Sequence, residues 1–300
     1  MYVVTGATGN TGSVVAEKLL SNRQHVRVVG RDAKRLERFT SQGAEGFVAD
    51  VTDAAALTKA FTGADAAYLL IPPNLSAPDV TGYQRQVAEA LASAVERSGA
   101  RYAVVLSSFG AEQTQGTGPV LGLHGFEERL NRIGALNALY LRAGYFMENV
   151  LPQVGVIKGF GSLAGPVRGD LALPMIATRD IGAFAADALA KREMQGKRAQ
   201  ELLGPRDVIY NEVAQIIGAA IGRPNLRYMQ LPGAQLKPVL LQMGMSESMA
   251  NGLLTMSDAL NSGQMRSLES RSAQNTTPTT FEQFVTEYFV PAFRGEAAHA

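Results

Sequence analysis

The stretch Val3-Val4-Thr5-Gly6-Ala7-Thr8-Gly9-Asn10-Thr11-Gly12 decides the fold of this chain of 300 residues. It stands between a short apolar run at residues 2–5 and a stretch with a helical apolar stripe, so the pattern predicts a strand, a tight turn and a helix. In such a turn Gly6 permits the sharp bend off the strand, and Gly12 lets the helix pack closely against it. Gly9 lies between them and leaves the backbone open to a ligand.

The start of this predicted helix has the chemistry of an anion site. The N–H groups of a first helical turn have no partner within the helix, and the helix dipole favours negative charge there. A glycine-rich turn without a ligand would have the same composition, but here a strand precedes it and a helix and further βαβ units follow. The motif therefore predicts that a dinucleotide places its pyrophosphate here. The predicted contacts are Gly6, Thr8, Gly9, Asn10, Thr11 and Gly12.

Short runs rich in Val, Leu and Ala alternate with amphipathic stretches through the first half of the chain. The runs barely alternate in polarity, which is typical of strands covered by helices on both faces. This predicts an α/β fold with a Rossmann-type, doubly wound parallel sheet. The predicted strands are residues 2–5, 26–29, 46–49, 66–71, 102–107 and 138–141.

The pattern changes after about residue 144, which predicts a smaller, mixed α/β cap on the C-terminal side. Residues 1–150 form the predicted NAD(P)-binding Rossmann domain, to which residues 179–203 return with one more buried strand. Residues 151–178 and 204–300 form the predicted substrate-binding cap. Within the cap, the glycine-rich residues 155–174 predict loop and short strand, whereas residues 211–222 and 281–289 predict helices.

Composition narrows the class of protein. Hydrophobic residues make up 46% and charged residues 18%, which excludes a mostly disordered chain. The net charge of +1 gives no reason to expect nucleic acid or an anionic membrane as partner. The chain contains no cysteine and three scattered histidines, His25, His124 and His299, so we expect no metal site. The N-terminus lacks the pattern of a secretory signal, and we expect a soluble, cytoplasmic protein.

The end of the second predicted strand indicates which dinucleotide binds. An NAD site usually has Asp or Glu there, to accept a hydrogen bond from the ribose, whereas an NADP site has Arg for the 2′-phosphate. Here Arg31 occupies that position, Asp32 comes one residue later, and Lys34 and Arg35 follow. The sequence favours NADPH over NADH. The alternative is that these basic residues only form the solvated start of a helix and bind no phosphate.

Three further strand ends contribute predicted cofactor contacts. Asp50 and Val51 follow the third strand, close to the expected adenine, although Asp50 could instead cap the next helix. Ile71 and Pro72 end the fourth strand, where they either wall the cofactor ribose or simply stop the strand. Ser107 ends the fifth strand, as a cofactor contact or as a strand cap.

Four motifs together resemble one family. They are Thr5-Gly6-Ala7-Thr8-Gly9-Asn10-Thr11-Gly12, Val105-Leu106-Ser107-Ser108, His124-x-x-x-Glu128-x-Leu130 and Leu141-Arg142-Ala143-Gly144-Tyr145-Phe146-Met147-Glu148-Asn149. They resemble the NmrA-like group of atypical short-chain dehydrogenase/reductases, which includes NADPH:quinone reductases, triphenylmethane reductases and NADP-sensing regulators. The resemblance implies that the last motif opens the cap and faces the nicotinamide. The implied substrate pocket consists of Ser108, Phe109, Tyr145, Phe146 and Asn149.

The chain departs from the usual short-chain dehydrogenases at their proton-transfer pair, Tyr-x-x-x-Lys. None of the nine tyrosines has a lysine four residues later. His124 stands where such a tyrosine is expected, and Glu128 follows one helical turn later. We therefore take His124 and Tyr145 as the candidate catalytic residues, with an exposed helix-start histidine as the alternative for His124. Glu127 is expected to be solvated, and Arg142 either meets a phosphate or makes a structural pair.

Two functions remain compatible with these residues. The first is an NADPH-dependent oxidoreductase that transfers hydride to a planar, electron-poor acceptor such as a quinone, because such an acceptor needs orientation more than strong acid catalysis. The alternative is a non-catalytic NADP(H)-sensing protein that binds a regulatory protein partner. A homodimer is compatible with either function. No helix-turn-helix, zinc finger or basic stripe supports direct binding of DNA.

Overall fold

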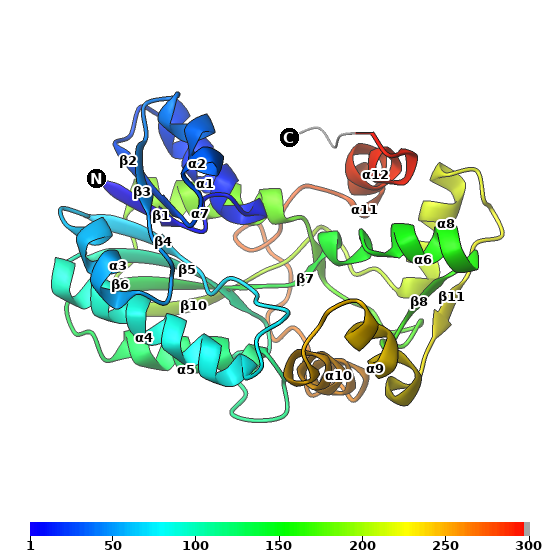
Figure 1. Ribbon diagram of the computed structural model, residues 1–300. Helices are drawn as coiled ribbons and strands as arrows, with labels where there is room; N and C mark the ends of the chain where they lie inside the picture. Colours follow the sequence, from blue (N-terminus) through cyan, green and yellow to red (C-terminus); the bar gives the residue numbers. More distant parts are fainter. Residues whose placement is uncertain (297–300) are drawn as a thin grey trace.

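A seven-stranded parallel sheet forms the centre of the larger part of the molecule, on the left in Figure 1. The computed structural model describes residues 1–296, so His299 lies outside the described residues. The strand order is β10-β6-β5-β4-β1-β2-β3, and each neighbouring pair is parallel. The order runs outward from β1 in both directions, which is the doubly wound arrangement of a Rossmann-type fold. The predicted fold class is therefore confirmed.

The strands of this sheet lie where the sequence predicted them, within a few residues. Two strands end earlier than expected: β3 ends at Val48 and not at residue 49, and β4 ends at Leu69 and not at Ile71. The prolines that follow Ile71 have no N–H groups to donate to a ladder. The strands are β1 (Tyr2–Thr5), β2 (Val26–Gly30), β3 (Glu45–Val48), β4 (Ala66–Leu69), β5 (Tyr102–Ser108), β6 (Asn137–Ala143) and β10 (Lys197–Leu202).

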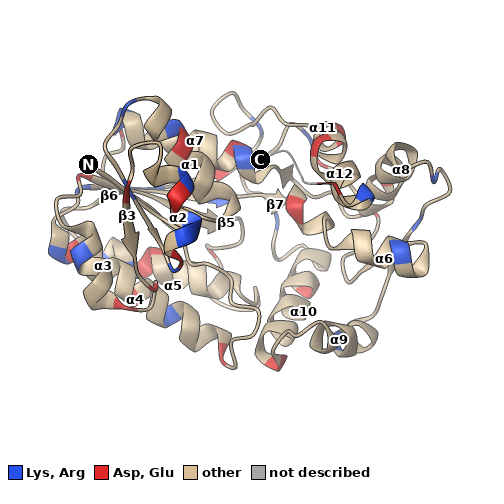
Figure 2. Cartoon of the chain, turned by 45° about the horizontal axis from the view of Figure 1, so that its top comes forward, with Lys and Arg blue, Asp and Glu red and all other residues tan. Residues whose placement is uncertain are grey.

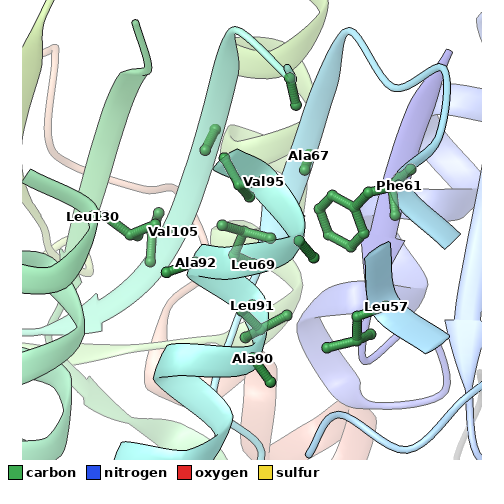
Figure 3. Packing of buried hydrophobic residues seen from close by; sticks show 14 of the residues in the cluster. Leu57, Phe61, Ala67, Leu69, Ala90, Leu91, Ala92, Val95, Val105 and Leu130 are labelled. Atoms are coloured by element: carbon green, nitrogen blue, oxygen red, sulfur yellow. The ribbon is translucent and has the colours of Figure 1, made fainter. Parts of the chain in front are cut away.

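Helices cover both faces of the sheet, each with its own apolar core. Figure 3 shows one of these cores, in which Leu57 and Phe61 meet Leu91 and Leu69. Both faces are covered, which explains why the strand sequences are apolar without alternation. One face carries α1 (Asn10–Ser21), α2 (Ala33–Thr40) and α7 (Thr178–Lys191), and the other carries α3 (Ala54–Phe61), α4 (Val80–Ser98) and α5 (Val120–Asn131).

A second, smaller part of the molecule has a separate core of aliphatic and aromatic side chains. Between residues 1 and 296, no helix is long and apolar enough to cross a bilayer. The second part contains β7 (Tyr145–Phe146), η1 (Met147–Val150), α6 (Gln153–Phe160), β8 (Leu163–Gly165), β9 (Met175–Ile176), α8 (Tyr210–Ala220), β11 (Tyr228–Gln230), α9 (Gly233–Gln242), α10 (Glu247–Asn261), α11 (Phe281–Phe284), the π-helical turn η2 (Val285–Phe289) and α12 (Val290–Arg294).

The prediction of loop at residues 155–174 is wrong at its start, because α6 occupies this position. The helix buries Ile157 and leaves open space around Gly155 and Gly159. The Gln153 side chain holds it in place by donating to the Ala164 carbonyl and accepting from the Ala164 N–H. A helix with so few buried positions has no apolar stripe that a sequence pattern would detect.

Glycines allow the chain to cross closely between the two parts. A Cβ on Gly144 would lie 2.1 Å from the Pro174 carbonyl oxygen, and a Cβ on Gly204 would lie 1.8 Å from the Met175 carbonyl oxygen. Both distances are far below van der Waals contact. Gly144 N–H also donates to the Leu202 carbonyl, which ties the end of β6 to the end of β10. The crossing therefore leaves room for hydrogen only.

We predict that Gly144→Ala destabilises the protein by about 2 kcal/mol or more, because its methyl group forces the crossing strands apart. Gly134→Ala is the matched control, since a Cβ there meets nothing within 4 Å. Urea unfolding of both variants measures the difference. Equal stabilities would show that the crossing adapts to a side chain.

Candidate functional site

The glycine turn between β1 and α1 forms an open cradle. Gly6 has a φ of +61°, which favours glycine, and its carbonyl accepts from the Gly9 N–H at 2.9 Å. A Cβ on Gly12 would lie 2.3 Å from the Gly6 carbonyl oxygen, so only glycine permits this approach of α1 to β1. In the described part of the chain no side chain caps the first turn of α1. The N–H groups of this first turn are therefore free to donate hydrogen bonds to an anion.

The basic residues after β2 divide into two roles. Asp32 caps α2 by accepting from the Lys34 N–H, and Arg35 donates to the Thr8 carbonyl at 3.0 Å. Arg35 therefore holds the glycine turn to α2, while Arg31 remains exposed. Figure 2 shows Lys and Arg interspersed with Asp and Glu along the helices.

Asp50 stands near Arg31 at the same edge of the sheet. It accepts from the side chain and the N–H of Thr52, and these bonds hold its carboxyl pKa below the usual value, with a smaller contribution from Arg31. Asp53, rather than Asp50, caps α3. The capping alternative for Asp50 is therefore wrong. Val51, beside it, is largely buried.

Tyr83 on α4 joins this region and was missed in the sequence. Its hydroxyl donates to the Pro72 carbonyl at 3.1 Å. Burial raises the pKa of Tyr83, nearby Asp50 raises it further, and nearby Arg31 opposes both. Tyr83 thus lies close to Asp50 and Arg31, with its hydroxyl bound to the segment that follows β4. Its place in the first turn of the helix after a strand is the signal that could have found it. Ile71, which follows β4, is partly buried against the core that α3 and α4 form on this face of the sheet.

Ser107, at the end of β5, is bound to a buried carboxylate. Its hydroxyl donates to Glu127 Oε1 at 2.6 Å. Glu127 is only 5% exposed, so the expectation that it is solvated is wrong. Its oxygens also accept from Arg142, at 3.2 Å from Nε and 2.7 Å from Nη2. The structural pairing of Arg142 is therefore confirmed, and the network joins α5 to β5 and β6.

Ser108 and Phe109 turn away from that network. The Ser108 hydroxyl donates to the Phe109 carbonyl, and the Phe109 ring is buried in the second core. The ring is therefore a packing element beside the end of β5.

His124 lies in the first half of α5 with its Nδ1 2.9 Å from the Ala111 carbonyl oxygen. Together with Glu112, Lys197 and other polar side chains it lines a hollow of about 340 Å³ beside β6 and β10. Glu128 is exposed and accepts from Asn131 at 3.3 Å. Among the described side chains, no group of three or more His, Asp and Glu residues is arranged to hold a metal ion.

Tyr145 and Phe146 form β7, directly after the end of β6. The Tyr145 hydroxyl lies 2.9 Å from the hydroxyl of Tyr210, at the start of α8. Phe146 packs partly buried against Ile176, and Asn149 is exposed. The sequence could not predict that Tyr210 meets Tyr145, because the two residues are 65 positions apart and no local pattern links them.

We predict that Arg142→Met destabilises the protein by about 3 kcal/mol, because it leaves the Glu127 carboxylate buried without its cation. Adding Glu127→Leu should recover most of the loss, since the unpaired charge is then gone. Lys237→Met breaks an exposed ion pair and is the control, with an expected loss below about 1 kcal/mol. Denaturant unfolding measures all three. An Arg142→Met loss no larger than the control would contradict the structural role.

Known proteins resemble this chain over different lengths. Agroclavine dehydrogenase of Claviceps fusiformis is 26% identical over 176 residues, which are 57% of this chain and only 59% of that protein. The uncharacterized oxidoreductase YesF of Bacillus subtilis is 26% identical over 266 residues, covering 87% of this chain and 85% of the relative. The structure of NADPH-dependent quinone oxidoreductase QOR2 from Escherichia coli, complexed with NADPH, matches with a TM-score of 0.82 at 23% identity. That match covers 96% of this chain and 100% of the other.

Family membership follows from the extent of the match. The NmrA-like family model matches residues 2–285, which include the glycine turn, the whole parallel sheet and most of the second part. The motifs at the ends of β1, β5 and β6 that resemble this family all lie within the matched residues. The chain belongs to the NmrA-like family.

Proposed function

We propose that this protein is an NADPH-dependent oxidoreductase that reduces a planar, electron-poor acceptor such as a quinone. One observation carries the proposal, namely the uncapped start of α1 behind the glycine turn, at the point where the strand order reverses. In doubly wound sheets a dinucleotide binds across the carboxyl ends of the strands at this point. The names of the matched proteins support redox chemistry, since they include a dehydrogenase and two oxidoreductases.

The side of the sheet formed by β2 and β3 would hold the adenosine half. Arg31, which is exposed at the end of β2, would pair with the 2′-phosphate that distinguishes NADPH from NADH. Asp50, Val51 and Tyr83 would border the adenine. Arg35 would act indirectly, because its bond to Thr8 fixes the turn on which the pyrophosphate rests.

The side formed by β4, β5 and β6 would hold the nicotinamide half and the acceptor. When bound, NADPH supplies a hydride, and the chain has to supply orientation, exclusion of water and a proton. Ile71, Pro72 and Ser108 would border the nicotinamide ribose and ring. Ser107 would keep the end of β5 in place through Glu127. Tyr145 and Phe146 would offer aromatic surface to a flat acceptor, beside Asn149.

Two groups are candidate proton donors. His124 has Nδ1 engaged with the Ala111 carbonyl and shares a polar hollow with Glu112 and Lys197. Tyr145 lies at the end of β6 and keeps its proton, since burial raises its pKa. Its position directly beyond the carboxyl ends of the strands favours Tyr145 as the donor.

The proposed function predicts NADPH oxidation that depends on an added acceptor. We expect a panel of small benzoquinones and naphthoquinones to include substrates, with NADPH used at least about 10-fold better than NADH because of the phosphate contact. Anaerobic steady-state absorbance at 340 nm measures it, with no-acceptor and no-enzyme controls. Tight NADPH binding without turnover for any acceptor would contradict the proposal and favour a nucleotide sensor.

We further predict that Arg31→Ala weakens NADPH binding by about 10- to 100-fold and leaves NADH binding nearly unchanged, because one charge-assisted contact to the 2′-phosphate is lost. Arg38→Ala is the matched control. It also removes an arginine, but Arg38 lies within α2 and stacks over the neighbouring Phe39. Titration calorimetry with both nucleotides measures the ratio. Equal losses for NADPH and NADH would remove Arg31 from the phosphate site.

A further inference from the structure

Two tyrosine hydroxyls from distant segments meet at the end of β6. Tyr145 in β7 and Tyr210 at the start of α8 lie edge to face, with ring centroids 6.2 Å apart and hydroxyl oxygens 2.9 Å apart. The Tyr210 ring also stacks on Tyr228, at 4.6 Å between centroids. The Tyr228 hydroxyl donates elsewhere, to the Val167 carbonyl at 2.6 Å. The position of Tyr210 is therefore set by packing on both sides.

Burial decides the direction of the hydrogen bond between the two hydroxyls. Tyr210 is only 5% exposed, and within residues 1–296 its hydroxyl has Tyr145 as its one hydrogen-bond partner. If Tyr145 were the donor, the proton of Tyr210 would be buried without an acceptor, which is strongly unfavourable. Tyr210 therefore donates to Tyr145. The proton of Tyr145 is left free to point away from Tyr210.

The same bond makes Tyr145 the better acid of the two. Burial raises the pKa of both phenols, so both are protonated near neutral pH. The bond from Tyr210 acts in the opposite direction on Tyr145, because it stabilises the Tyr145 phenolate. For Tyr210, which donates in this bond, the bond raises the pKa further. A proton therefore leaves Tyr145 more easily than it leaves Tyr210.

We propose that Tyr210 is a positioning residue that fixes and activates Tyr145 as the proton donor to the acceptor, an inference that rests on the proposed function. A quinone gains a hydride from NADPH at one carbonyl oxygen, which leaves a negative charge on the other oxygen. That oxygen takes a proton from Tyr145 Oη, which gives a hydroquinone and NADP⁺. The Tyr145 phenolate, held by the Tyr210 hydroxyl, then takes a proton from water. In this chain, which lacks a Tyr-x-x-x-Lys pair, the Tyr210 hydroxyl stabilises the phenolate that the lysine would otherwise stabilise.

The kinetic test compares single and double variants with the best quinone of the panel. We expect Tyr145→Phe to lower kcat about 100-fold and Tyr210→Phe to lower it about 10-fold, with little change in the KM for the acceptor. The double variant should be no slower than Tyr145→Phe, because Tyr210 acts only through Tyr145. Tyr228→Phe is the matched control, with unchanged kcat, since it removes a hydroxyl that is bound elsewhere.

A second readout uses the protein without nucleotide. The ¹³Cζ resonance of a tyrosine reports whether its oxygen accepts a hydrogen bond, and the resonance of Tyr145 is assigned by its loss in Tyr145→Phe. We expect Tyr210→Phe to shift this resonance and Tyr228→Phe to leave it in place. If the Tyr145 resonance does not shift in Tyr210→Phe, Tyr210 does not donate a hydrogen bond to Tyr145, and the proposal is overturned whatever the activity of the variant.

The outcomes separate the two proposals. Wild-type protein that oxidises no NADPH with any quinone would overturn the proposed function and the role of the pair in it. Wild-type turnover together with a fully active Tyr210→Phe variant would overturn the pair alone. Turnover with the predicted loss in both tyrosine variants and an unchanged Tyr228→Phe variant supports both proposals.

Discussion

The close approach of α1 to β1 is the constraint on which the rest of the molecule depends. A Cβ on Gly12 would lie 2.3 Å from the Gly6 carbonyl oxygen, so α1 approaches β1 this closely only because residue 12 is glycine. This position aims the first turn of α1 across the point where the strand order reverses. It also brings α1 beside α7, where Gly182 has the same effect against Thr11. A larger residue at Gly12 would move the anion site and the helix layer together.

The two halves of the proposed site are built in different ways. On the side of β2 and β3 the residues come from the strand ends that follow the glycine turn, and bonds within the same part of the molecule, such as Arg35 to Thr8, fix them. On the side of β5 and β6 the residues depend on partners from both parts of the molecule. Glu127 holds Ser107 and Arg142 in one buried network, and Tyr210 comes from α8 to meet Tyr145. The acceptor side is therefore a joint product of the sheet and the second part.

This difference explains what the sequence could predict. The strands and the glycine turn carry local signals, because apolar runs and glycine spacing follow directly from burial and backbone geometry. The roles of Glu127 and Tyr210 have no such signal. A glutamate in a helix is usually solvated, and only the arrival of Arg142 and Ser107 makes burial of this one favourable. The helix α6 was missed for a related reason, since it buries few apolar positions and is held by bonds from Gln153 to Ala164, which lies outside the helix.

The central claim is that a dinucleotide lies on the glycine turn, and the most direct measurement is calorimetric titration of NADPH into the wild type and Gly9→Val. Gly9 has an ordinary φ of −96°, and a Cβ there comes no closer than 3.3 Å to its neighbours, so the variant is expected to fold. We predict saturable binding to the wild type and none to the folded variant, because the added side chain occupies the place of the pyrophosphate. Equal binding to both proteins would contradict the account.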